Sequence, residues 1–138
     1  MRYLALDLGE RRIGVAVGEI LAHPLTTLKR RSRVQDFAAI AELIRRREVD
    51  VVVVGLPLNM DGSSGFQAQR TLGYVERMKA ALSEMGVAVD VVLWDERLST
   101  EHADALMAES GHSVERRQGQ IDAAAAAVIL QSYLDRES

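Results

Sequence analysis

Cysteine is absent from this chain of 138 residues, as are several patterns that mark whole classes of protein. Without cysteine there is no disulfide bond and no thiolate metal site, which fits a reducing compartment. No signal-type segment opens the chain and no apolar run is long enough to cross a bilayer. We therefore expect a soluble, cytoplasmic protein with no membrane partner.

Motifs for several common enzyme classes are also missing. The sequence has no Walker-type GxxxxGKS/T motif and no apparent Ser/His/Asp set for nucleophilic catalysis. Its three histidines, His23, His102 and His112, lack the paired spacing of zinc ligands, so we interpret them as surface residues.

An excess of basic charge is lacking too, because 20 acidic residues outnumber 17 lysines and arginines, for a formal net charge of −3. This balance argues against a basic coat that binds nucleic acid regardless of sequence, although acids that hold metal also lower the count. Hydrophobic residues make up 48% of the chain, which is enough for a core. With no repeat or linker, we predict a single domain over residues 1–138.

Short apolar strands separated by helical segments predict an α/β fold. The strands are expected at Tyr3–Leu6, Ile13–Val17, Ala22–Arg31, Val51–Gly55 and Val87–Trp94. The four valines that begin the fourth strand indicate burial on both faces. Helices between the third, fourth and fifth strands imply right-handed crossovers and parallel pairing.

Capping signals predict where the helices begin and end. Two pairs have capping-box spacing, Ser32 with Gln35 and Ser64 with Gln67, and Gly86 is suited to ending the second helix. A short helix is expected at Glu101–Ser110, followed by a polar, mobile segment at His112–Gln120. The last helix is predicted to start near Ile121 and Asp122, with an alanine run that lets it lie close to the sheet.

Acidic residues stand at strand ends and helix starts in three places. Asp7 follows the first strand, Asp95 and Glu96 follow the fifth, and Asp122 opens the last predicted helix. If these ends converge, the carboxylates repel one another, and a hard divalent cation, Mg²⁺ or Mn²⁺, resolves that repulsion. Two such ions suit the hydrolysis of a phosphodiester. These four acids are therefore the candidate metal ligands.

Two of these assignments stay open at the level of sequence. Asp122 is equally suited to stabilising a helix N-terminus. Asp95 and Glu96 are adjacent, so strand alternation points them to opposite sides, and one is the ligand while the other pairs with Arg97. Periodicity does not indicate which.

Polar and basic residues near the same ends are candidates for substrate binding: Arg11, Arg12, Asn59, Asp61, Arg97, Ser99 and Thr100. Turn formation alone accounts for Asn59 and Asp61, and Arg97 with Ser99 or Thr100 could instead supply an ion pair and a helix cap. The basic run Lys29–Arg33 is interpreted as protection of an edge strand in preference to a phosphate-binding patch.

Four motifs resemble the YqgF (RuvX-type) family of RNase H-like nucleases. They are DLGERRIGVAVG at 7–18, VGLPLNMDG at 54–62, DERLST at 95–100, and Ile121-Asp122 before alanines. The resemblance implies an RNase H-like fold with a five-stranded mixed sheet in order 3-2-1-4-5 and helices on both faces. It implies that Asp7, Glu96 and Asp122 are catalytic and bind Mg²⁺ or Mn²⁺, and that the activity is maturation of the 5′ end of pre-16S ribosomal RNA.

One position departs from the family pattern. Members often carry lysines just before the last Asp, where this chain has Gln118 and Gln120. A cation there would contact substrate phosphate, and Arg116 and Arg117 could substitute for it.

Our leading hypothesis is a metal-dependent endonuclease for structured RNA, acting as a monomer or homodimer. One alternative is a Holliday-junction resolvase, which the family resembles and which needs two sites in a symmetric dimer to cut branched DNA. A second is a non-catalytic RNA-binding assembly factor. The D-x-G opening also resembles the phosphate loop of actin-like ATPases, but 138 residues leave no room for their second lobe.

Overall fold

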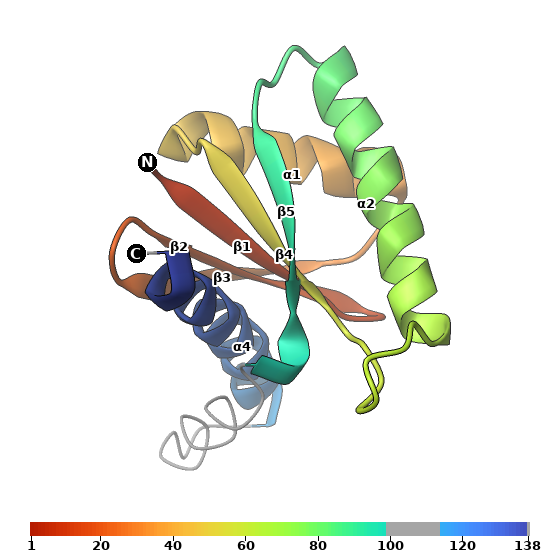
Figure 1. Ribbon diagram of the computed structural model, residues 1–138. Coiled ribbons are helices and arrows are strands. Elements are labelled where there is room, and N and C mark those ends of the chain that lie inside the picture. The colour runs from red at the N-terminus through yellow and green to blue at the C-terminus, as the bar shows by residue number, and fades with distance from the viewer. Residues whose placement is uncertain (99–113, 138) are drawn as a thin grey trace.

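Five strands form one mixed sheet in the order β3-β2-β1-β4-β5, as predicted (Figure 1). The structure, a computed structural model, describes residues 1–98 and 114–137, and of residues 114–118 it describes the backbone alone. The strands are β1 (Tyr3–Leu8), β2 (Arg12–Gly18), β3 (Ala22–Lys29), β4 (Val51–Leu56) and β5 (Asp90–Asp95). β1 pairs antiparallel with β2 and parallel with β4, and β5 continues the parallel half of the sheet.

Helices cover both faces of this sheet, which explains why β4 is apolar throughout. α1 (Arg33–Arg47) and α2 (Phe66–Glu84) lie on one face, and α4 (Val114–Glu137) lies on the other (Figure 1). Alternate residues of β1 divide between the two cores: Leu4 and Leu6 pack under α1 and α2, and Ala5 packs under α4. By the same alternation Asp7 lies on the α4 face. No helix within the described ranges has the length and apolarity needed to span a membrane.

The first helix begins as predicted, but the second does not. At α1, Ser32 Oγ accepts the backbone N–H of Gln35 at 3.2 Å and the Gln35 side chain returns the bond, completing the capping box. At α2 the capping residue is Gly65, and no side chain caps the helix. The prediction from Ser64 and Gln67 is wrong because the chain stays extended through Gly65 (φ −88°, ψ −169°), so Ser64 lies outside the first turn.

Several strand boundaries also differ from prediction; β1, for example, continues through Asp7 to Leu8. Gly86 ends the second helix with φ of +73°, as expected, but the next residue, Val87, still donates its N–H to Leu82 O at 2.9 Å. β5 therefore starts later, at Asp90, the first residue that pairs with β4. β3 ends at Lys29, before the predicted Arg31, whose N–H donates to the Asp36 carboxylate at the start of α1.

The last helix begins earlier in the chain than the sequence predicted. α4 begins at Val114, so the segment predicted to be polar and mobile is helical from that residue. Thr27 of β3 donates its hydroxyl to the carbonyl of Gly119 at 2.6 Å, which ties this early part of the helix to the sheet. Asp122 thus lies two turns inside α4. The helix predicted at Glu101–Ser110 lies outside the described residues.

Close contact between α4 and β2 depends on a residue without a side chain. A Cβ added at Gly14 would lie 1.8 Å from the carbonyl oxygen of Asp122 and 3.1 Å from the backbone nitrogen of Ala123. Two backbones can approach this closely only where no Cβ intervenes. Gly14 is also the partner of Asp7 in the β1–β2 ladder, so the contact brings Asp122 beside Asp7.

Gly14→Ala should lower the free energy of unfolding by at least about 2 kcal/mol, because helix or strand has to move to admit the methyl group. Urea denaturation of the purified protein measures this change. Gly119→Ala is the matched control: nothing lies within 4 Å of its Cβ position, and alanine is the better helix former. The same chemical change should therefore stabilise the protein at 119, and equal effects at both sites would contradict the close contact.

Candidate active site

Two acids from separate strands meet at the end of the sheet where β1, β4 and β5 finish. Asp7 is the fifth residue of β1, and Glu96 is the first residue of η1 (Glu96–Leu98), the short helix that follows β5. The carboxyl group of Glu96 donates a hydrogen bond to Asp7. Both residues are half-buried.

Glu96 reaches Asp7 across β4, and a glycine makes room for it. A Cβ at Gly55 would lie 2.6 Å from Glu96 Oε1 and 2.8 Å from Ile129 of α4. Any larger residue at this point of β4 would push the Glu96 side chain away from the sheet. The glycine after the four valines of β4 is therefore part of the site.

Partial burial raises the pKa of both acids in this pair. Loss of hydration raises the pKa of Glu96 to about 8, and the negative charge of Asp7 acts in the same direction. Burial also raises the pKa of Asp7, and the hydrogen bond from Glu96 partly offsets that effect. These pKa shifts favour a protonated Glu96 whose carboxyl group donates to Asp7.

Asp122 is the third acid at this site. Its charge is close enough to raise the pKa of Asp7 further. Its own carboxylate forms an ion pair with Arg12, with Nε and Oδ2 2.7 Å apart. Because α4 begins at Val114, the alternative in which Asp122 merely stabilises a helix N-terminus is wrong.

The structure separates Asp95 from Glu96, as strand alternation predicted. Asp95 faces Arg97, whose Nη2 lies 2.6 Å from Oδ2 and whose Nε donates to both carboxylate oxygens. These hydrogen bonds lower the pKa of Asp95. Of the adjacent acids, Glu96 contacts Asp7 and Asp95 pairs with Arg97.

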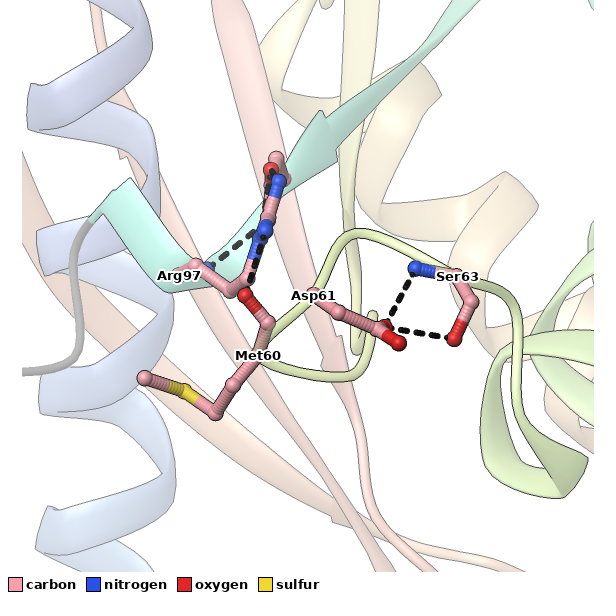
Figure 2. A network of polar contacts seen from close by, with 5 residues as sticks. Met60, Asp61, Ser63 and Arg97 are labelled. Carbon is pink, nitrogen blue, oxygen red and sulfur yellow. Dashed lines mark hydrogen bonds and ion pairs between the residues drawn. The ribbon is translucent and has the colours of Figure 1, made fainter.

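Arg97 also fixes the loop that follows β4. Its Nη1 donates to the carbonyl of Met60 at 3.1 Å, and the Asp61 carboxylate accepts the hydroxyl of Ser63 at 2.6 Å (Figure 2). The bonds from Ser63 lower the pKa of Asp61. Asn59 donates to the same hydroxyl at 3.1 Å. Asn59 and Asp61 thus order the turn, and both residues are exposed to solvent.

The other predicted substrate-binding residues are placed as follows. The Arg11 side chain is exposed in the turn between β1 and β2, and Arg12 is partly buried against Asp122. Ser99 and Thr100 lie outside the described residues, as do the side chains of Arg116, Arg117 and Gln118. Gln120 is exposed near the start of α4.

The acids suit a hard cation in kind, since all are carboxylates, which Mg²⁺ and Mn²⁺ prefer as ligands. Among the described side chains, however, no three acids or histidines converge on a common point. Asp7 and Glu96 are hydrogen-bonded to each other, whereas the carboxylate of Asp122 pairs with Arg12. The sequence did not reveal that ion pair or the role of Gly55, since both depend on packing between distant segments.

Comparison with known proteins identifies relatives over the whole chain. A family described as "RuvX: Holliday junction resolvase" matches residues 1–136. A protein of Anaeromyxobacter dehalogenans (strain 2CP-1) that is named a pre-16S rRNA nuclease is 50% identical over 100% of this chain and 99% of its own length. One of the same name from Syntrophus aciditrophicus is 42% identical over 98% of this chain and 89% of its own.

Solved structures agree on the fold at much lower sequence identity. The T. thermophilus RuvC structure in complex with a Holliday junction has a TM-score of 0.62 at 16% identity, covering 99% of this chain and 96% of that one. The Fowlpox virus resolvase in complex with Holliday junction DNA has a TM-score of 0.60 at 11% identity, covering 99% of both chains. The fold is therefore RNase H-like, as predicted, and the chain belongs to the RuvX family.

Proposed function

We propose that this protein is a metal-dependent nuclease that hydrolyses phosphodiester bonds in structured RNA, with pre-16S ribosomal RNA as its substrate. The observation that carries the proposal is the half-buried, hydrogen-bonded pair of Asp7 and Glu96, with a third acid, Asp122, beside it. The RNA substrate is inferred from relatives at 42% and 50% identity that are named pre-16S rRNA nucleases. Such a role places the protein in the cytoplasm.

Partly buried carboxylates that lie close together lower the stability of the folded protein unless a cation offsets their repulsion. Without a cation, a proton lowers the repulsion between Asp7 and Glu96, and one of the two carboxyl groups then stays uncharged near pH 7. Asp7, Glu96 and Asp122 would hold Mg²⁺ or Mn²⁺, with Asp95 in support. A bound divalent ion lowers the pKa of water and stabilises charge on the leaving oxygen.

Basic residues around the acids would hold the substrate. Arg12 compensates the charge of Asp122 and stays partly exposed, so it can also meet an incoming phosphate oxygen. Arg97 orders the loop of Asn59 and Asp61 next to the site, and we assign these residues to positioning the strand. Arg11, Ser99 and Thr100 remain predicted phosphate contacts.

Resolution of Holliday junctions is the second candidate, since the family description and both resolvase structures concern such junctions. That reaction requires a symmetric dimer with two sites. An assay of the purified protein on precursor 16S RNA and on a four-way DNA junction, each with Mn²⁺, Mg²⁺ or chelator, separates the two. RNA cleavage that chelator abolishes supports our proposal, and junction cleavage alone contradicts its RNA substrate. Binding of RNA without any cleavage would identify an assembly factor.

Asp7→Asn should reduce cleavage by roughly a thousandfold or more, because it removes a charge that holds the cation. Its fold should be retained, as judged by circular dichroism. Asp90→Asn makes the same change at an exposed position at the far end of β5 and should leave the cleavage rate unchanged. Full activity of Asp7→Asn would remove Asp7 from the mechanism.

Without divalent cations, the wild-type protein should lose stability as pH rises from about 4.5 to about 8. The folded pKa of Glu96 exceeds its ordinary value of 4.5, so the unfolded chain binds fewer protons in that window. Glu96→Gln should flatten this dependence and raise the melting temperature at pH 8, with scanning fluorimetry as the measurement. Mn²⁺ should raise the melting temperature of the wild type more than that of the variant. Identical pH profiles for both proteins would refute a protonated Glu96.

A further inference from the structure

A cavity of about 340 Å³ opens on the other face of the sheet, at the same end as the acids. It starts at Leu8 and Gly9, directly after Asp7, and continues between the beginning of α1 and α2. None of the acids of the candidate active site lines it. Its lining instead includes four arginines, Arg30, Arg33, Arg70 and Arg77. Glu10 is the one acid among the described lining residues.

Two of these arginines are fixed by the protein. Arg30 lies over the ring of Tyr74, 4.7 Å from its centre, and its Nη1 donates to the carbonyl of Gly9 at 2.7 Å. It also compensates the buried carboxylate of Asp36, 4.0 Å away. Arg70 Nη1 lies 3.8 Å from Glu10 Oε1, so two of the four arginines of the cavity have an acidic partner and two do not.

The other two arginines are available for a ligand. Arg33 is the first residue of α1, and Arg77 lies on the exposed side of α2. Within the described residues, neither side chain has an ion-pair or hydrogen-bond partner. Positive charges gathered around one hollow repel one another unless an anion lies between them. The guanidinium group binds phosphate through paired, charge-assisted hydrogen bonds, so phosphate is the anion that this lining fits best.

An exposed aromatic ring stands at the rim of the same cavity. Phe66, the first residue of α2, is 78% exposed, and Arg70 lies over its ring at 5.6 Å. Burial would normally be expected for one of only two phenylalanines in the chain. Proteins that bind single-stranded nucleic acid combine basic grooves with exposed rings on which bases stack.

We propose that this arginine cavity binds a single-stranded segment of the substrate next to the scissile bond. Arg33 and Arg77 contact its phosphates, and a base stacks on Phe66. Asp7 and Gly9 are two residues apart in an extended chain, or about 7 Å, so one strand can pass from the acids to the cavity. This inference rests on the proposed function for the identity of the ligand. It assigns Arg33 to a phosphate site, where the sequence favoured protection of an edge strand by the basic run Lys29–Arg33.

Binding measured in chelator tests the cavity separately from cleavage. The probe is a fluorescein-labelled 12-nucleotide oligouridine, and the readout is fluorescence anisotropy over a range of salt concentrations. Arg33→Ala/Arg77→Ala should weaken binding by at least about tenfold and lower the salt slope by about 1.4, for two lost phosphate contacts. Phe66→Ala should weaken binding by about tenfold and leave the slope unchanged.

Arg46→Ala/Lys79→Ala is the matched control, since it removes the same charge from α1 and α2 away from the cavity. Both residues form only exposed pairs within their own helices, so folding should be unaffected. Equal binding by the two double variants would overturn the inference, even if the protein cleaves RNA. Loss of binding only in the cavity variant supports it, even if no variant cleaves RNA, in which case the proposed function fails alone.

Two competition experiments test whether the cavity binds a different class of ligand. If uridine monophosphate displaces the oligonucleotide at equal phosphate concentration, the cavity is a site for free nucleotides and the inference is wrong. If polyglutamate of equal charge displaces it equally well, the site recognises an acidic protein segment and the inference is also wrong. Weak competition by both supports binding of a strand.

Discussion

The hydrogen bond between the carboxyl groups of Asp7 and Glu96 is the constraint on which the rest of this structure depends. It joins the ends of β1 and β5 across β4, in a place where both residues are half-buried. Neighbouring features make this contact possible. Gly55 leaves space above β4, Gly14 lets α4 approach β2, and Arg12 compensates the third acid. The two glycines and the arginine thus adapt the local packing and charge to this contact.

Charge is divided between the two faces of the sheet at this end of the molecule. The acids lie under α4, and the arginine cavity lies between α1 and α2. A net charge of −3 therefore does not oppose binding of a polyanion, because the positive groups are gathered next to the site. The β1–β2 turn separates the two regions, so a nucleic-acid strand would meet both only by passing over Gly9 and Glu10.

Relatives with one fold need not share one substrate. Two resolvase structures share the fold of this chain at 11% and 16% identity, which establishes architecture alone. The fold alone therefore does not distinguish RNA from branched DNA as the substrate of the proposed nuclease.

Local patterns in the sequence determined the buried β4 and the capping box at Ser32. Four motifs along the chain determined the family, and through that resemblance the strand order. The sequence also placed Asp7 and Glu96 at strand ends. Tertiary structure decided what these residues do. In the folded chain Glu96 contacts Asp7, and Asp95 pairs with Arg97. Helix α4 begins at Val114, so Asp122 does not cap it. The physical reason is that such contacts join segments up to 110 residues apart, and their geometry depends on packing distances that no local pattern encodes.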